Sequence, residues 1–226
     1  MKLAVLYSGG KDSNYSLWIA SKENEISCLI NLKSENEYSY MFQKTGTDIV
    51  KYQSEALEIP LIQFETKGEK EHELKDLKKA IKLAIEKYKI SGVVSGAIKS
   101  TYQASRVQKI CNELDIWCFN PIWQIDEKKY LDELIKNKFD IRIVKIASYP
   151  FDKKWLGRKL DENYKKDIEK IDEKMPLSYV GEGGETESIV LDSPCFKKKI
   201  EIETSIKMES ENCGDLIFER VKLVEK

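Results

Sequence analysis

The chain has 226 residues, 34% of them charged, yet its formal net charge is only −1. The length predicts one large domain or one domain with a small extension, and the balanced charge argues against direct nucleic-acid binding. No apolar run approaches the ~18 residues of a membrane span and no signal peptide precedes the first predicted strand, so we expect a cytoplasmic protein without membrane contact.

The first predicted element is a short apolar strand at residues 3–7, which runs directly into a glycine turn. The turn reads Ser8-Gly9-Gly10-Lys11-Asp12-Ser13, and a helical pattern follows it. Glycines let backbone N–H groups approach an anion, while the helix N-terminus and Lys11 add positive charge. We name residues 8–13 the glycine loop and predict that it binds a nucleotide phosphate.

The spacing within the glycine loop excludes two common nucleotide-binding motifs. A Walker loop needs four residues between its first glycine and the Gly-Lys pair, whereas Gly9, Gly10 and Lys11 are contiguous. The G-x-G-x-x-G dinucleotide fingerprint is also missing. The alternative interpretation is an ordinary strand-to-helix turn with a solvated lysine.

Strands and helices then alternate along the chain. Strands are expected at residues 26–32, 61–64, 92–96, 117–120 and 141–146, and helices at 47–57, 71–88, 100–114 and 130–135. Repeated strand–helix units predict an α/β fold with a Rossmann-like, doubly wound parallel sheet covered by helices on both faces.

The pattern changes in the last third of the chain. A charged helix is expected at residues 161–174, and β-rich segments at 188–191, 199–208 and 216–224. We therefore predict a nucleotide-binding domain at residues 1–124 and a smaller α+β, substrate-side subdomain at residues 125–226.

Two further segments of the first domain have functional features. Gly96 ends a predicted strand, and its carboxyl end should face the same crevice as the glycine loop. Gln103 and Arg106 then share a helical face, where Arg106 can bind a phosphate or carboxylate or else form a structural ion pair. Residues 38–46 place aromatic side chains and Met41 where they can cover an adenine or pack in the core.

Residues 181–187, which we name the acidic turn, carry three carboxylates around a Gly-Gly pair. Glu182, Glu185 and Glu187 lie where a backbone can pass close to a ligand. Carboxylates in this place suit a cationic substrate, an ammonium ion or Mg²⁺. A solvated acidic loop is the alternative.

The single histidine and the five cysteines argue against other chemistries. A Ser-His-Asp hydrolase would have to use His72, and the chain has no G-x-S-x-G elbow. None of the cysteines forms a C-x-x-C pair, so zinc or iron–sulfur binding has little support and buried thiols are expected.

Together these segments resemble the diphthine–ammonia ligases, a family of N-type ATP pyrophosphatases in which the glycine loop is the PP-loop. The resemblance runs from the first strand to about Ile200. It rests on Ser8-Gly-Gly-Lys-Asp-Ser13, Tyr40-Met-Phe-Gln43 with Gly46, Gly96-Ala-Ile with Ser100, Tyr102-Gln103, Arg106-Val107, Leu156-Gly157 with Leu160-Asp161, Gly181-Glu-Gly-Gly-Glu185, and Leu191-Asp192 with Pro194 and Phe196-Lys-Lys-Lys-Ile200. The family commonly has an aromatic residue after Glu185, where this chain has Thr186.

The resemblance implies a reaction: diphthine on translation elongation factor 2 is adenylated by ATP and amidated by ammonia, giving diphthamide, AMP and pyrophosphate. It implies that ATP contacts Ser8, Gly9, Gly10, Lys11, Asp12, Ser13, Met41, Gln43, Gly96, Ser100, Gln103 and Arg106. It implies that the substrate contacts Tyr102, Glu182, Gly183, Gly184, Glu185 and Glu187. Lys11, Asp12, Glu182 and Glu185 would act in catalysis, Asp12 would hold Mg²⁺, and ammonia would come from solution or from a partner.

Other functions stay open at this point. A tRNA-modifying PP-loop enzyme, such as a thiolase or a lysidine-type ligase, would want catalytic cysteine pairs or a basic tRNA-binding face, and the sequence has neither. Amidation of a small-molecule carboxylate and a non-catalytic nucleotide sensor with the same fold remain alternatives. A homo-oligomer is also left open.

Overall fold

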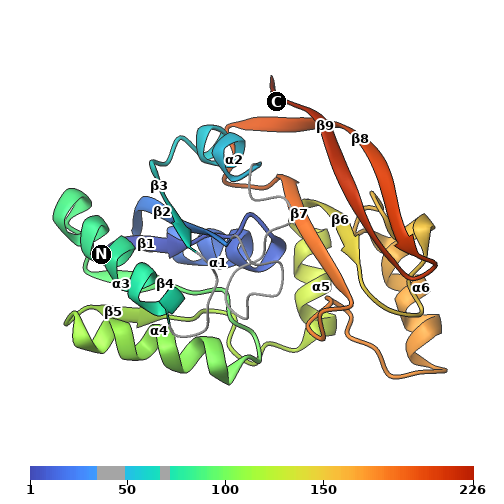
Figure 1. The fold of residues 1–226 in the computed structure, drawn as a ribbon, viewed down its shortest axis with the longest axis horizontal. Helices are drawn as coiled ribbons and strands as arrows, with labels where there is room; N and C mark the ends of the chain where they lie inside the picture. Colours follow the sequence, from blue (N-terminus) through green and yellow to red (C-terminus); the bar gives the residue numbers. More distant parts are fainter. Residues whose placement is uncertain (35–48, 67–71) are drawn as a thin grey trace. The chain divides into compact units, whose positions relative to one another are not determined.

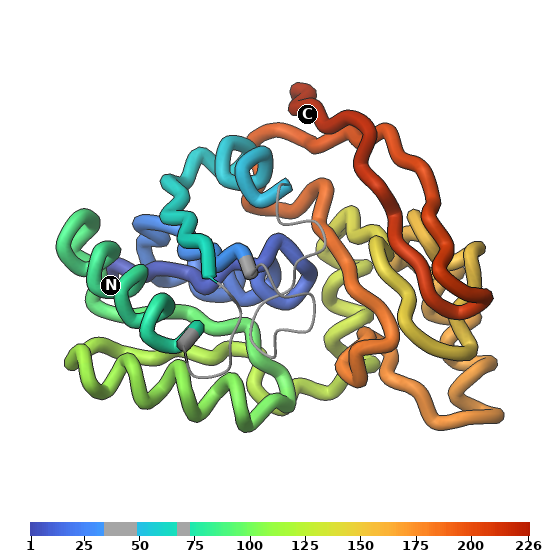
Figure 2. Tube along the Cα trace, in the orientation of Figure 1, coloured from blue at the N-terminus to red at the C-terminus, as the bar shows by residue number. Residues whose placement is uncertain are grey.

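The computed structural model describes residues 1–34, 49–66 and 72–226, which divide into two units, Met1–Gln124 and Ile125–Lys226 (Figure 1, Figure 2). Each unit is built on its own sheet, parallel in the first and antiparallel in the second. The predicted fold class, a doubly wound parallel sheet followed by a smaller α+β part, is confirmed.

The first unit alternates strands and helices. All its neighbouring strands pair in parallel, in the order β3-β2-β1-β4-β5. Parallel neighbours need crossover connections, and the helices supply them. The elements are β1 (Lys2–Leu6), α1 (Lys11–Ser21), β2 (Glu25–Ser34), α2 (Ile49–Leu57), β3 (Leu61–Thr66), α3 (His72–Tyr88), β4 (Gly92–Val94), α4 (Thr101–Glu113) and β5 (Trp117–Phe119).

Helices cover both faces of this sheet. Side chains of α3 and α4 form one apolar cluster with alternate strand residues that include Ala4, Ile30 and Val93. Helix α1 lies outside that cluster and contacts β1, β2 and β4, so it covers the opposite face, where Val5 and Leu29 are buried. Burial on both faces explains why these strands read as nearly continuous apolar runs.

The order of the strands reverses beside β1. The chain passes from β1 outward to β2 and β3, then crosses back to place β4 on the other side of β1. In open α/β sheets, such a reversal leaves a crevice beyond the carboxyl ends of the two strands, and ligands bind there. The glycine loop follows β1 and Gly96 follows β4, so both segments border this point.

The second unit is a four-stranded antiparallel sheet with two α-helices. Its elements are α5 (Glu127–Lys136), β6 (Asp140–Ile146), the short 3₁₀ helix η1 (Lys153–Trp155), α6 (Glu162–Asp172), β7 (Thr186–Asp192), β8 (Lys198–Ser210) and β9 (Cys213–Glu225), with the strand order β7-β6-β9-β8. Strand β6 was expected to continue the parallel strand–helix pattern, but it pairs antiparallel with β7 and β9. Its partners come from the C-terminal β-rich segments, which run against it.

Two general features complete the fold. No helix in the described ranges is both long and apolar enough to cross a membrane. All five cysteines are free thiols, and Cys28 and Cys111 are buried in the first unit. Burial raises the pKa of Cys28 to about 12, so this thiol stays protonated and packs as a small hydrophobe.

Candidate functional site

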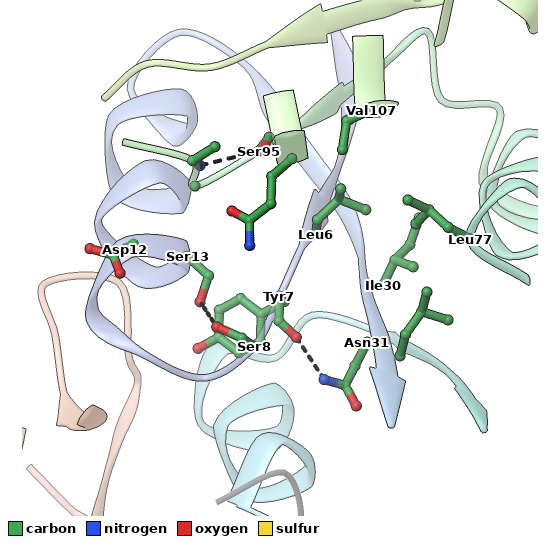
Figure 3. Close-up of a pocket in the computed structure, with 14 residues that line it drawn as sticks. Leu6, Tyr7, Ser8, Asp12, Ser13, Ile30, Asn31, Leu77, Ser95 and Val107 are labelled. Carbon is green, nitrogen blue, oxygen red and sulfur yellow. Dashed lines mark hydrogen bonds between the residues drawn. The ribbon is translucent and has the colours of Figure 1, made fainter. Parts of the chain in front are cut away.

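A cavity of about 160 Å³ opens at the reversal point of the parallel sheet (Figure 3). Its lining combines polar side chains, which include Ser8 of the glycine loop and residues of the first turn of α1, with apolar side chains. Figure 3 shows Ser8 and Ser13 pointing toward each other at one side, with Leu6, Ile30 and Leu77 on the other. The full lining is Leu6, Tyr7, Ser8, Asp12, Ser13, Ile30, Asn31, Leu32, Leu77, Ser95, Gly96, Ala97, Gln103 and Val107.

The backbone of the glycine loop leaves the start of α1 accessible to an anion. Gly9 adopts a left-handed conformation with φ +86°, and Gly10 is the N-cap but has no side chain to cap the first turn. Ser8 Oγ lies 3.3 Å from Ser13 Oγ and accepts a long bond of 3.4 Å from the Gly10 N–H. Such a helix start, with hydroxyls beside it, is a typical phosphate site.

Lys11 and Asp12 form an ion pair within the glycine loop. Lys11 Nζ lies 2.9 Å from Asp12 Oδ2, and the two side chains are 8% and 28% exposed. Asp12 lines the cavity, whereas Lys11 is not among its lining residues in the described part of the chain. The lysine charge is therefore held at the loop by its neighbour, where a bound phosphate would compete for it.

Gly96 allows the end of β4 to approach the start of α1. A Cβ atom at this position would lie 3.0 Å from the Asp12 carbonyl carbon and 3.1 Å from the Ser13 nitrogen. Any side chain would push these backbone segments apart, since both contacts are with main-chain atoms. Glycine here is thus what brings two predicted segments to one cavity.

The residues of α4 that were predicted to bind ATP have different environments in the structure. Gln103 lines the cavity, and Ser100 caps the helix by accepting a 3.3 Å bond from the Gln103 N–H. Arg106 stacks on Tyr102, with its guanidinium carbon 3.5 Å from the ring centroid. The shared face expected for Gln103 and Arg106 therefore does not place both in the cavity lining.

In the second unit, the acidic turn is closed by its own backbone. The Gly184 N–H donates to the Gly181 carbonyl at 3.2 Å, and both glycines have positive φ, +84° and +75°. Helix α5 supports the turn from one side: Ser178 Oγ accepts from the Glu182 N–H at 2.8 Å and donates to Glu127 Oε2 at 2.7 Å. The glycines at its tip, 183 and 184, are exposed.

Glu185 has an unusual environment within this turn. Its Oε1 lies over Gly183, in the space that a Cβ atom would fill, and its Oε2 is buried without a hydrogen-bond partner among the described residues. Burial raises the pKa of the Tyr164 phenol, and the Glu185 charge adds to this rise. A buried carboxylate oxygen without a donor is suited to receive one from a ligand.

The structure brings together five of the residues expected to bind ATP. Ser8, Asp12, Ser13, Gly96 and Gln103 line one cavity. Met41 and Gln43, expected to contact ATP, lie outside the described residues. Tyr7, Asn31 and Ser95 also line the cavity and were not predicted. Tyr7 and Ser95 directly follow β1 and β4 and could have been found from that place, whereas Asn31 lies within β2.

Comparison with known proteins matches both units of the chain to the same family. The family model for the diphthamide synthase N-terminal domain matches residues 1–117, and that for the diphthamide synthase C-terminal domain matches residues 126–224. The rat and human proteins named diphthine–ammonia ligase are both 34% identical to this chain, over 91% of it and 84% of their own length. The Schizosaccharomyces pombe protein of that name is 31% identical over 98% of the chain but only 39% of its own length.

Both family models match in order, and together they extend over nearly all of the chain. Relatives that share a third of its residues bear one and the same name. The chain belongs to the diphthamide synthase family.

Proposed function

We propose that this protein is an ATP-dependent amide ligase that converts diphthine on translation elongation factor 2 into diphthamide. Ammonia is the nitrogen source, and AMP and pyrophosphate are the other products. The observation that carries the proposal is the cavity at the strand reversal, where the glycine loop and Gly96 meet in a chain of this family.

The chemistry explains why ATP is needed. A carboxylate resists attack by ammonia because the departing group would be an oxide. In the proposed reaction a diphthine carboxylate oxygen attacks the α-phosphorus of ATP and pyrophosphate leaves. Ammonia then attacks the acyl carbon, AMP departs with the carboxylate oxygen, and the nitrogen loses a proton to a base. The protein must therefore stabilise a leaving pyrophosphate and then accept a proton.

The glycine loop suits the first task. Ser8, Ser13 and the amides at the start of α1 offer hydrogen-bond donors, and Lys11 offers a full positive charge close by. A preorganised donor of this kind typically contributes ~10²–10³ in rate. Asp12, the one carboxylate in the cavity lining of the described residues, suits a Mg²⁺ ion shared with phosphate oxygens, and the metal would neutralise phosphate charge.

The acidic turn suits the second task. Its carboxylates favour a cation, either the trimethylammonium group of diphthine or an ammonium ion, and Glu185 has a buried oxygen that can accept a proton or a hydrogen bond. The backbone N–H of Glu182 donates to Ser178 Oγ, and this bond fixes the position from which the Glu182 side chain extends. We assign substrate binding to Glu182, Gly183, Gly184, Glu185 and Glu187 on this basis, while Tyr102 of the first unit stays an expectation from the family resemblance.

The test is direct conversion of the protein substrate. Purified enzyme, ATP, Mg²⁺ and an ammonium salt are mixed with diphthine-bearing elongation factor 2, and the factor is weighed by mass spectrometry. The expected result is replacement of one carboxyl by one carboxamide, a loss of about 1 Da, with one AMP formed per amide. AMP formation only when a small-molecule carboxylate or a tRNA replaces the elongation factor would favour that substrate, and ATP binding without AMP in any of these mixtures would favour a nucleotide sensor.

We place this reaction in the cytoplasm, because a translation factor is the proposed substrate. Ammonia from solution is sufficient for the proposal, and a 15N-labelled ammonium salt checks it. Label in the product without any other nitrogen donor is the expected outcome.

A further inference from the structure

Two buried side-chain amides donate hydrogen bonds to the glycine carbonyls of the glycine loop. Gln53 of α2 donates from Nε2 to the Gly9 carbonyl at 2.9 Å. Asn14 of α1 donates from Nδ2 to the carbonyls of Gly9 at 3.1 Å and of Gly10 at 2.9 Å. Gln53 is 0% exposed and Asn14 2%, and neither is among the cavity-lining residues in the described ranges.

The planarity of the peptide bond means that holding these carbonyls also sets the direction of the N–H groups that follow them. In a planar trans peptide, the C=O and the following N–H point in opposite directions. Fixing the Gly9 carbonyl therefore fixes the direction of the Gly10 N–H, and fixing the Gly10 carbonyl does the same for the Lys11 N–H. Both N–H groups lie at the start of α1, where an anion can accept from them, and the Gly10 N–H makes a long bond of 3.4 Å to Ser8 Oγ, for which a phosphate would compete.

A hydrogen bond from Tyr7 and close packing by Gln53 fix the orientation of the two side-chain amides. The Tyr7 hydroxyl donates to Asn14 Oδ1 at 2.6 Å, so the amide is turned with its NH₂ toward the two carbonyls. A Cβ atom at Gly9 would lie only 2.6 Å from Gln53 Oε1, which shows how closely Gln53 packs against the loop. Gly9 has a left-handed φ of +86°, and Gln53 and Asn14 both donate to its carbonyl.

We propose that Gln53 and Asn14 are positioning residues for the phosphate-binding amides of the glycine loop. They act through the backbone and specifically toward ligands that carry a pyrophosphate group. The inference rests on the proposed function only in assuming that this loop binds the pyrophosphate part of ATP.

The experiment compares Gln53→Met with Ser54→Ala. Methionine keeps the volume of Gln53 but cannot donate to Gly9, and Asn14 still holds that carbonyl, so the fold is expected to survive. Ser54 is the next residue of the same helix and donates to the Ile59 carbonyl at 2.6 Å, away from the loop, so Ser54→Ala is a matched loss of one hydrogen bond to backbone. Binding of inorganic pyrophosphate, ATP and AMP is measured by calorimetry, alongside KM and kcat for AMP release.

Gln53→Met is expected to weaken pyrophosphate and ATP binding about tenfold, the size of one buried hydrogen bond, with AMP affinity unchanged. The KM for ATP should rise while the KM for the protein substrate stays the same. Ser54→Ala should leave all three affinities and both KM values unchanged, whatever its effect on melting temperature.

Wild-type pyrophosphate affinity in Gln53→Met, or an equal loss of pyrophosphate and AMP affinity, would overturn the inference. If Gln53→Met does not fold, Tyr7→Phe removes only the hydroxyl that orients Asn14, and a severalfold selective loss of pyrophosphate affinity is expected. A wild-type chain that binds pyrophosphate but forms no amide would remove the ligase proposal and leave this inference standing. A wild-type chain that binds neither ATP nor pyrophosphate would remove both.

Discussion

The two glycine-rich turns of this protein are built in different ways. Four of the six residues of the glycine loop are buried, and Gln53 and Asn14 donate hydrogen bonds to its glycine carbonyls. The acidic turn is closed by a backbone bond between Gly184 and Gly181, and its tip is exposed. A tightly held loop suits a ligand of constant shape and charge, such as pyrophosphate, whereas an accessible acidic turn suits a cationic group carried by a larger partner.

The largest expected effect comes from removing the charge of the glycine loop. Lys11→Ala should fold, because the Asp12 side chain is 28% exposed and can be solvated, but AMP release should fall by ~10²–10³. Lys22→Ala, at the other end of the same helix, is the control and should keep full activity. AMP release and circular dichroism are the measurements, and near-normal turnover in Lys11→Ala would remove the phosphate role of the loop.

A matched test of the acidic turn is Glu185→Gln. Loss of its charge should lower amide formation by ~10², the range of a missing acid–base or charge contact, while ATP affinity stays unchanged. Glu173→Gln, an exposed carboxylate after α6, is the control and should behave as wild type. A collapse of ATP affinity in Glu185→Gln would assign this residue to the nucleotide instead of the substrate.

Replacing one glycine of each turn with alanine tests this difference between the two turns further. Gly9 and Gly184 have nearly the same φ, +86° and +84°, but a Cβ at Gly9 meets Gln53 while a Cβ at Gly184 meets nothing within 4 Å. Each change should cost about 1–2 kcal/mol of unfolding free energy from the left-handed backbone. Only Gly9→Ala should also weaken ATP binding, by at least about tenfold, because overpacking shifts the loop.

Equal ATP affinities in Gly9→Ala and Gly184→Ala would show that the support behind the glycine loop has no consequence for the nucleotide. Chemical denaturation gives the stability of both variants, and calorimetry gives their ATP affinity.

The smallest effect is expected at the start of α4. Ser100 is both the N-cap of this helix and a predicted ATP contact, so Ser100→Ala should lower the unfolding free energy by about 1 kcal/mol and weaken ATP binding a few-fold. Asp126→Ala removes the corresponding cap of α5 and should cause the same loss of stability without an effect on ATP. Unchanged ATP affinity in Ser100→Ala would leave Ser100 as a cap alone.

Local patterns in the sequence were enough to predict most of the first unit. The glycine loop and Gly96 could be found because their features, a strand followed by glycines and a helix start, are contiguous. The reversal of strand order that joins them follows from a parallel sheet of this class. The antiparallel pairing of β6 could not be found, because its partner residues in β7 lie at least 40 residues later in the chain.

Contacts between residues far apart in the chain, and the orientation of neighbouring side chains, could also not be predicted from the sequence. Gln53 is the one polar side chain among the buried residues of α2, but its partner Gly9 lies 44 residues away, and helical spacing alone cannot identify that partner. The ion pair between Lys11 and Asp12 depends on side-chain orientation, which spacing does not determine. The support of Glu182 by Ser178 and Glu127 likewise links α5 to a distant turn.

The most direct measurement is a crystal structure with a non-hydrolysable ATP analogue and Mg²⁺. We expect the β- and γ-phosphates to accept hydrogen bonds from Ser8, Ser13 and the first amides of α1, with Lys11 drawn from Asp12 toward the phosphates. A nucleotide bound elsewhere, with the glycine loop empty, would contradict the account.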